Sequence, residues 1–314
     1  MDLLDIKIFR ELAQDKEAYS LQFDIRKSLS SISKNLGIDE DTVRNRIEKF
    51  KQTGFLRGWT VLVNPNLIGL GVAQLFLDIP RDASKLDIIG KLKKVNGVSS
   101  IINCFGSSLI VFFLYGKRKP FRSQKRAIEK VSMSAKTISV MKPFPECKVR
   151  LSHTDVLILR SIRREPRKLY SVISKETGIS SRTVKRRLDR MVKEKALLLA
   201  PDLNLKKIEG LASLSLLIIY DSYESKIEAE PKILSHLQEN IAVAELHDPL
   251  HAFMILVIAN ISGAEEIAEW LRSQPGVKAV RLDIEQDRIE VYQWVEKQLE
   301  DSLMGMSKVA KQSG

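Results

Sequence analysis

The spacing of apolar residues repeats itself along the chain at an offset of 141 positions. Residues 32–56, ISKNLGIDEDTVRNRIEKFKQTGFL, align without a gap with residues 173–197, ISKETGISSRTVKRRLDRMVKEKAL. Nine of these positions are identical, and most other apolar positions match in kind. Upstream, DIKIFREL at 5–12 resembles DVLILRSI at 155–162. We therefore predict two related halves, joined near Pro143 and Pro145, which interrupt regular structure.

Each half is expected to open with three short helices, of which the last two flank a tight turn. In the second half, the middle helix should end at Gly178, a residue suited to the left-handed backbone that terminates helices. Ser180 can then cap the third helix by accepting hydrogen bonds from its free N–H groups. The apolar stripe of that helix has a helical spacing and consists of Val184, Leu188 and Met191. This order of elements predicts a helix-turn-helix.

Beyond each helical segment, the periodicity changes to strands that alternate with helices. In the first half we expect strands over 71–80, 98–106, 107–116 and 136–144, with helices over 84–97 and 121–134. In the second half we expect strands over 211–221, 241–249, 252–260 and 277–286, with helices over 230–240 and 263–274. Both patterns are the β-α-β-β-α-β motif of ferredoxin-like domains. Because the strands are apolar on both faces, the face without helices requires a partner sheet or a ligand.

The expected fold class is α+β, with two repeats of a winged helix-turn-helix followed by a ferredoxin-like domain. Domain boundaries are predicted at 1–62, 63–145, 150–203 and 208–300, the last with a C-terminal extension. Residues 53–65 should form a short two-stranded wing with Arg57 and Trp59 near its tip, where Trp59 packs. In the extension, a helical stripe consists of Ile289, Tyr292, Val295 and Leu299, although residues 288–294 equally fit a strand.

Net charge separates the chain into regions of opposite sign. The whole protein of 314 residues carries +12. Residues 61–150 carry +11 and residues 151–200 carry +8, whereas residues 1–60 carry +1 and residues 201–314 carry −8. This distribution indicates that only part of the chain contacts a polyanion.

Composition narrows the classes of protein further. Two cysteines, Cys104 and Cys147, fit a reducing cytoplasm better than a disulfide framework. No CxxC spacing is present and the chain has only two cysteines and four histidines, so we expect no structural zinc site. No apolar run has the length of a membrane span, and the charged N-terminus is not typical of a signal peptide. Phosphate-binding loops, nucleophile elbows and paired catalytic carboxylates are also absent, so we predict neither a catalytic residue nor a cofactor.

The third helix of the second half concentrates positive charge. Residues 180–191, SSRTVKRRLDRM, hold five basic side chains and one acid, Asp189. A helix-turn-helix inserts this helix into the major groove of double-stranded DNA with its N-terminus first, where Arg can pair with guanine. The candidate contacts around its first turns are Ser180, Ser181, Arg182, Thr183, Lys185 and Arg186. Arg190 and Lys193 are candidate phosphate contacts, and Arg187 fits an intramolecular ion pair as well as a DNA contact. The alternative is a solvated basic helix on a protein-interaction module.

The corresponding helix of the first half is weaker as a DNA-binding element. Asp39 can cap it, but Glu40 and Asp41 bring negative charge to the end that would approach phosphates. These acids favour the helix dipole and oppose DNA. The side chains that remain available are Thr42, Arg44, Asn45 and Lys49, and Asn can read adenine. The pattern fits a second DNA-reading element and a structural copy equally well.

Two further segments carry candidate chemistry. HDPLH at 247–251 contains His247, Asp248 and His251, which fit either a polar hairpin turn or a metal or proton site. GKRKPFRSQKR at 116–126 places cations at a predicted helix N-terminus, where the dipole disfavours them. The basic segment fits a solvated helix start, a DNA-phosphate contact or an acidic partner surface, such as the acidic second half.

The order of helix-turn-helix, wing and β-α-β-β-α-β domain resembles the leucine-responsive regulatory protein/AsnC family of transcription regulators, and the resemblance covers nearly the whole chain twice. In that family the sheet domains pair back to back into dimers and often bind amino acids or similar small effectors. The resemblance implies an internal pseudo-dimer, with further homo-oligomers allowed. The family's Gly-containing turn between its second and third strands appears here as CFGSS, with Gly106, whereas the second half has HDPLH.

The leading hypothesis is a cytoplasmic, sequence-specific DNA-binding transcription regulator whose second helix-turn-helix is the main DNA reader. Because the two copies differ, we expect an asymmetric DNA site. Siroheme decarboxylases, enzymes that act on tetrapyrroles, also resemble this architecture of two related halves. A protein-binding adaptor is the third hypothesis, which the weakly charged first copy allows.

Overall fold

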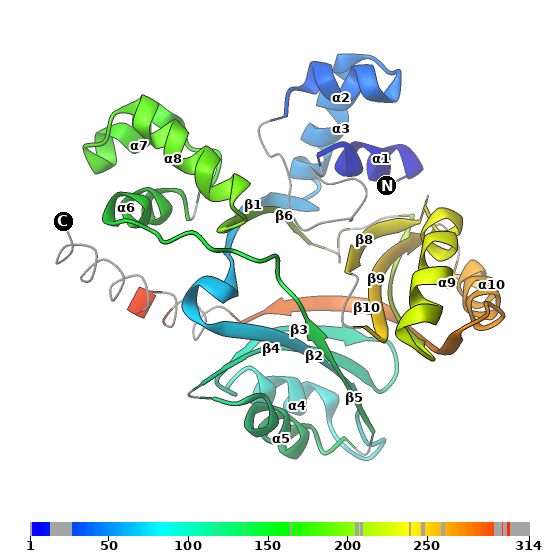
Figure 1. Ribbon diagram of the computed structural model, residues 1–314. Coiled ribbons are helices and arrows are strands. Elements are labelled where there is room, and N and C mark those ends of the chain that lie inside the picture. Colours follow the sequence, from blue (N-terminus) through cyan, green and yellow to red (C-terminus); the bar gives the residue numbers. More distant parts are fainter. Residues whose placement is uncertain are drawn as a thin grey trace.

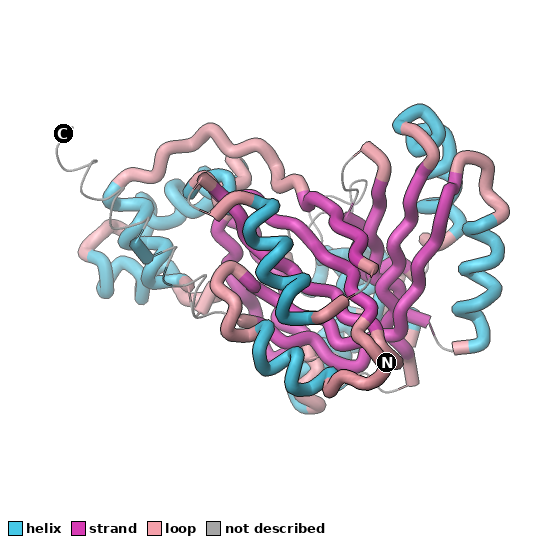
Figure 2. The backbone as a smooth tube through the Cα atoms, turned by 90° about the horizontal axis from the view of Figure 1, so that it is seen from below, coloured by secondary structure: helices cyan, strands magenta, loops and turns pink. Residues whose placement is uncertain are grey.

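The structure is a computed structural model that describes residues 2–12, 27–117, 119–134, 136–163, 165–204, 207, 210–238, 240–245, 249–258, 261–291, 297 and 300–301. Two small helical units, which we call the first head and the second head, lie above a large sheet layer in Figure 1. Helices cover the outer sides of the sheets (Figure 2). Among the helices described, none has the length and apolarity that crossing a bilayer requires.

Both sheet domains have the predicted β-α-β-β-α-β order. The first consists of β2 (Leu70–Asp78), α4 (Lys85–Leu92), β3 (Val98–Cys104), β4 (Ser108–Gly116), α5 (Phe121–Ser132) and β5 (Thr137–Lys142). The second consists of β7 (Ala212–Tyr220), α9 (Tyr223–His236), β8 (Ile241–Glu245), β9 (His251–Ile258), α10 (Ser262–Arg272) and β10 (Val277–Glu290). The α+β prediction with a ferredoxin-like motif is therefore confirmed.

The two domains share one antiparallel sheet. Its eight strands follow the order β5-β2-β4-β3-β10-β7-β9-β8. Strand β10 makes the junction, because its residues from Val277 to Ile284 pair with β7 and its residues from Glu285 to Glu290 pair with β3. A register shift between Glu285 and Asp287 separates the two pairings. The strand alternative for residues 288–294 is thus confirmed as far as Glu290, whereas Tyr292, Val295 and Leu299 lie outside the described residues.

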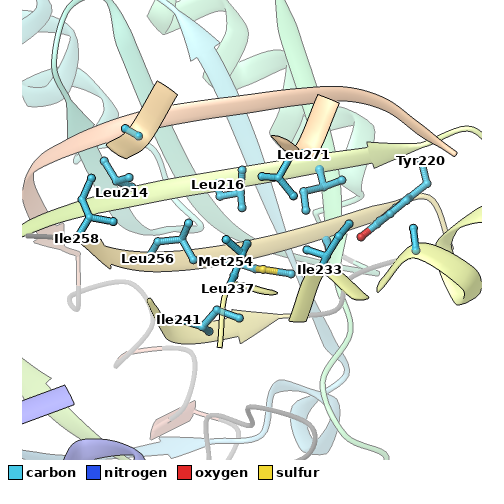
Figure 3. Packing of buried hydrophobic residues seen from close by; sticks show 14 residues of the cluster. Leu214, Leu216, Tyr220, Ile233, Leu237, Ile241, Met254, Leu256, Ile258 and Leu271 are labelled. Carbon is cyan, nitrogen blue, oxygen red and sulfur yellow. The ribbon is translucent and has the colours of Figure 1, made fainter. Parts of the chain in front are cut away.

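Each half of the sheet has a separate outer core beneath its helices. In the second domain, Leu214 and Leu216 of β7 and Met254 of β9 pack against Ile233 of α9 and against Leu237, which caps the end of that helix (Figure 3). These side chains alternate with residues that point to the opposite face, as the period of a strand requires. A corresponding cluster joins β2 and β4 to α4 and α5 in the first domain.

The inner faces of the two halves pack against each other. Phe76 and Phe112 of the first domain approach Phe253 of the second edge to face, with ring centroids 6.0 Å and 6.3 Å apart. Leu217 and Ile255 join the same buried cluster. We expected a partner sheet or a ligand on the sheet face that has no helices. The structure shows a partner sheet there, and it comes from the other half of the same chain.

Each head contains the three predicted helices. They are α1 (Leu3–Leu12), α2 (Leu29–Leu36) and α3 (Glu40–Gln52) in the first head, and α6 (His153–Ile162), α7 (Tyr170–Thr177) and α8 (Ser181–Lys193) in the second. Gly37 and Gly178 end α2 and α7 in the left-handed conformation, at φ of 65° and 71°. Glycine is favoured there because it has no Cβ to clash with the backbone.

The predicted two-stranded wing at 53–65 is wrong. Residues 56–63 form one strand, β1 (Leu56–Val63), whose antiparallel partner is β6 (Leu197–Leu203) of the second half. We call this two-stranded sheet the ribbon. Val61 packs into the cores of both heads, which explains why β1 stays extended instead of turning back on itself. Trp59 packs against the first head, as predicted.

The predicted start of the helix at Glu230 is also wrong. Helix α9 begins at Tyr223, where Ser222 caps it by accepting a hydrogen bond from the Ser225 N–H at 3.2 Å. Pro231 lies inside the helix instead of in its first turn. Proline has no N–H to donate to the backbone carbonyl four residues earlier. Because Pro231 lies on the exposed face of α9, water can bind that carbonyl and the helix continues.

We predict that Phe253→Ala lowers the free energy of unfolding by about 3–5 kcal/mol, because it removes a fully buried ring that touches both domains. Urea or guanidinium unfolding measures this change. Leu169→Ala is the matched control, since that side chain is 65% exposed and its removal should change stability by less than about 0.5 kcal/mol. Equal effects of the two substitutions would contradict the packing of the inner faces.

Candidate nucleic-acid interface

Helix α8 presents its cations to solvent and its apolar stripe to the second head. Ser180 caps it, with its Oγ accepting from the Thr183 N–H at 3.3 Å and lying 3.0 Å from the Thr183 hydroxyl. Val184, Leu188 and Met191 are buried as predicted. The predicted DNA-contact residues that are exposed are Ser180, Ser181, Arg182, Lys185, Arg186, Arg190 and Lys193, whereas Thr183 is half-buried.

The buried carboxylate of Asp155 forms ion pairs with two arginines of α8, Arg187 and Arg190. Asp155 of α6 is fully buried, and its Oδ2 accepts a hydrogen bond from Arg190 Nη2 at 2.7 Å. Arg187 Nη1 lies 3.3 Å from the same carboxylate and 2.9 Å from the Ser152 Oγ. The structure therefore places Arg187 in the intramolecular ion pair that was one of its two predicted roles. Arg190, predicted to meet phosphate, is also engaged, although 42% of its side chain stays exposed.

The same carboxylate belongs to the cap of α6. Ser152 accepts from the Asp155 N–H at 3.3 Å, and Asp155 accepts from the Ser152 N–H at 2.8 Å, which is a reciprocal capping box. Such a box satisfies free N–H groups at the helix start. Asp155 thus fixes the start of α6 and the position of α8 at once, which sets where the exposed cations of α8 point.

The first head contains an equivalent arrangement. Asp2 and Asp5 accept reciprocally from each other's N–H groups at 2.9 Å and 3.1 Å, and Arg46 Nη1 of α3 lies 2.8 Å from the Asp5 carboxylate. Hydrogen bonds to Asp2 and Asp5 raise the pKa of Arg46. Arg46 and Arg187 occupy the same position of the internal repeat. Sequence reasoning missed this shared role, although the identical Arg and the matching Asp were its signal.

The exposed side of α3 differs from that of α8. Arg44 donates to Glu40 Oε1 at 2.7 Å and also to Asp41, so neighbouring acids neutralise its charge. Thr42 is half-buried, whereas Asn45 and Lys49 are exposed. Asp39 occupies the N-cap position without the predicted side-chain hydrogen bond. By contrast, Arg182, Lys185 and Arg186 make no ion pair within the described part of the chain.

The ribbon fixes the two heads relative to each other. Seven residues of β1 pair with residues of β6, and Arg57 of β1 binds Asp202 of β6 with an N–O distance of 2.6 Å. Arg167 of the second head lies over the Trp59 ring, 5.9 Å from its centroid. In addition, Arg10 of α1 donates to the Ile241 carbonyl at 2.7 Å and 2.9 Å, which ties the first head to the second sheet domain.

Comparisons with known proteins agree with this geometry. Residues 151–195, the second head, match a family model described as winged helix-turn-helix DNA-binding. HTH-type transcriptional regulator Ptr1 of Methanocaldococcus jannaschii is 27% identical over 106 residues, covering 34% of this chain and 66% of the relative. Regulatory protein AsnC of Haemophilus influenzae is 27% identical over 105 residues, covering 33% and 63%.

LrpA of Pyrococcus horikoshii is similar to the same extent, with 26% identity over 97 residues, 31% of this chain and 69% of that relative. The chain thus spans about two thirds of the length of each of these regulators, and each alignment uses about a third of the chain. This chain is similar to regulators of the Lrp/AsnC type repeated in tandem. Its two repeats each carry a head and a ferredoxin-like domain.

A solved structure matches the tandem arrangement as a whole. The crystal structure of the siroheme decarboxylase NirDL covers 96% of this chain and 98% of its own, with a TM-score of 0.56 and 12% identity. NirDL in complex with an iron-uroporphyrin III analogue has a TM-score of 0.53 and 13% identity. At this identity the likeness describes the fold of the tandem Lrp/AsnC-like chain and not its chemistry.

Two other candidate segments were predicted, HDPLH at 247–251 and the basic segment at 116–126. His247 and Asp248 lie outside the described residues, and His251 begins β9. Among the residues that the structure describes, no group of three or more His, Cys, Asp or Glu is placed to hold a metal ion. The basic segment at 116–126 leads into α5, whose N-cap Pro120 makes no side-chain hydrogen bond.

We predict that Asp155→Asn lowers the free energy of unfolding by about 1–3 kcal/mol, because it removes the charge that pairs with two guanidinium groups while keeping the side-chain volume. Chemical denaturation measures the change. Asp189→Asn on the exposed face of α8 is the control, with an expected change below about 0.5 kcal/mol. If both substitutions act alike, the carboxylate does not hold α8.

Proposed function

We propose that this protein is a sequence-specific DNA-binding transcription regulator whose main reading element is α8. The observation that carries the proposal is the exposed face of α8, where Arg182, Lys185 and Arg186 project without an ion-pair partner among the described residues. An intramolecular role would place acids beside these cations, as happens around Arg44 in α3. The named regulators among the relatives support the same conclusion.

In this proposal the N-terminal half of α8 enters the major groove. Arg182 and Arg186 lie one turn apart and contact base edges, with Ser181 and Lys185 beside them. Lys193, near the end of α8, meets a phosphate. Arg190 shares its guanidinium between Asp155 and the DNA backbone, because two-fifths of its side chain remains exposed.

The first head takes a secondary role on the DNA. Its candidate contacts Thr42, Arg44 and Asn45 follow acids that weaken attraction to phosphate. The ribbon keeps this head at a fixed place beside α8, so the protein reads an asymmetric site in which one half contributes most of the affinity. The sheet domains pair within the chain and are the place for an amino acid or a related small effector. We propose that the protein acts in the cytoplasm.

An enzyme of the siroheme-decarboxylase type is the second candidate, because the fold likeness to NirDL spans the entire tandem chain. Two observations oppose it. The unpaired cations of α8 lie on an exposed helix face, and three phenylalanine rings fill the contact between the inner sheet faces. The absorbance spectrum of the purified protein separates the two candidates, since a bound tetrapyrrole absorbs strongly in the visible range.

The decisive experiment is binding to duplex DNA over a salt series. We expect Arg182→Ala/Arg186→Ala to weaken binding to a selected genomic fragment by about 100-fold or more, since removing each base-reading arginine costs roughly 1–3 kcal/mol. The slope of log K against log salt should also become shallower, because the variant removes two cations from the surface that attracts the polyanion.

The control for this experiment is Arg44→Ala/Asn45→Ala in the first head. Its effect should be much smaller, because Arg44 is already neutralised by Glu40 and Asp41. Wild-type and α8-variant proteins that bind DNA equally well, or not at all, would rule out the regulator as proposed. A coloured protein with neither activity would then favour the enzyme.

A further inference from the structure

The outer helix layers of the two sheet domains carry opposite charge. Helices α4 and α5 cover the first domain, and α9 and α10 cover the second at the equivalent places of the repeat. In Figure 1 the first pair lies below the sheet and the second pair lies to its right, so they cannot meet within one chain. We call them the basic layer and the acidic layer.

The basic layer exposes six cations and one acid, Asp87 of α4. On α4 and just after it, and on α5, the exposed basic residues are Lys91, Lys93, Lys94, Arg122, Arg126 and Lys130. Arg122, Arg126 and Lys130 follow one another at a spacing of four residues, so they form one ridge along α5. None of these six side chains is in an ion pair among the described residues; within the layer, only Lys125 pairs, with Glu129 at 3.7 Å.

The acidic layer has the reverse composition. Its exposed acids are Glu224, Glu228, Glu265, Glu266 and Glu269. Its exposed cations are Lys232 and Arg272, and Arg272 lies 3.1 Å from Glu265. The two layers therefore carry opposite charge at the same position of the two repeats.

An exposed apolar patch accompanies the acids. Tyr223 and Ile227 lie one turn apart on α9 and are 54% and 55% exposed, and Leu250 is 41% exposed. Leu250 lies close to them, because its carbonyl accepts from the Tyr220 N–H at 2.9 Å and Lys226 of α9 donates to the adjacent His251 carbonyl at 2.7 Å. On the basic layer Leu86 of α4 is 77% exposed. Apolar side chains rimmed by charge are typical of protein–protein contact sites.

We propose that the acidic layer of one copy of this protein docks on the basic layer of a second copy. Charge complementarity selects this occupant, because every chain carries one layer of each sign together with exposed apolar residues on both. Unlike surfaces meet in such a contact, so it is heterologous and joins chains head to tail. The heads point away from the basic layer in Figure 1, so the contact leaves α8 accessible.

The basic layer could instead hold DNA, and its position argues against that occupant. A duplex bound by α8 lies on the side of the sheets opposite to α4 and α5 (Figure 1). The same duplex would have to bend around the whole molecule to reach both sites, which costs several kcal/mol of deformation energy by the order of magnitude known for DNA bending.

Sedimentation velocity over a concentration series tests the proposal without DNA. We expect the wild-type mass to rise from the single-chain value of 35.6 kDa to at least twice that value at roughly 0.05 M salt. The mass should return to the single-chain value at roughly 1 M salt, where charges are screened within about 3 Å. A wild-type protein that keeps one mass under both conditions would overturn the proposal.

Charge reversal identifies the two surfaces. Glu265→Lys/Glu269→Lys and Lys91→Glu/Arg126→Glu should each abolish self-association. Their equimolar mixture should associate again, because the unaltered basic layer of the first variant can bind the unaltered acidic layer of the second. Lys175→Glu/Glu194→Lys, at exposed positions of the second head, is the control and should associate like wild type. Undiminished association of the layer variants, or no rescue in the mixture, would place the contact elsewhere.

The outcome is independent of DNA binding by α8. Variants of the layers should keep wild-type affinity for a short duplex at concentrations where single chains predominate, whereas Arg182→Ala/Arg186→Ala should keep self-association. If Lys91→Glu/Arg126→Glu instead lowers affinity for a short duplex by about the same factor as the α8 variant, the basic layer holds DNA and the docking proposal fails.

Discussion

Backbone hydrogen bonds between the two repeats hold this molecule together at two levels. At the level of the heads, β1 pairs with β6, and at the level of the sheets, β10 pairs with β3. Each pairing gives buried backbone groups the partners that they require. Because strands from both repeats complete each other, neither repeat forms a finished unit with its own residues, and the arrangement of both heads follows from the sheets below.

A second constraint acts inside each head, where a buried carboxylate links the first helix to the third. Asp155 satisfies its charge with the guanidinium groups of Arg187 and Arg190, and Asp5 does so with Arg46. A buried ion is stable only when its partners are placed well. The ion pairs of this buried carboxylate thus position α8, and they leave Arg182, Lys185 and Arg186 exposed on its other side.

Much of this architecture is visible in the sequence, because it depends on local patterns. Gly178 and Ser180 mark a turn and a cap through chemistry that needs no distant contact, and strand alternation gives the order of the sheet domains. The ribbon could not be predicted, because the pattern of residues 56–63 is the same whether the strand pairs with a neighbour or with residues 141 positions later. The start of α9 was predicted too late because proline favours the first turn of a helix. In the structure, the packing of α9 outweighs this preference of Pro231. Arg190 was likewise predicted to contact phosphate, because the sequence does not show that Asp155 lies beside it in the fold.

The covalent link between the repeats changes how such a molecule behaves on dilution. Two separate subunits dissociate when their concentration falls below the dissociation constant, whereas the halves here are joined by the chain between β5 and α6. The effective concentration of one half near the other is therefore fixed by the linker, in the millimolar range or above for short connections. The paired heads consequently stay assembled at a few molecules per cell, and mutation can alter one head without altering the other.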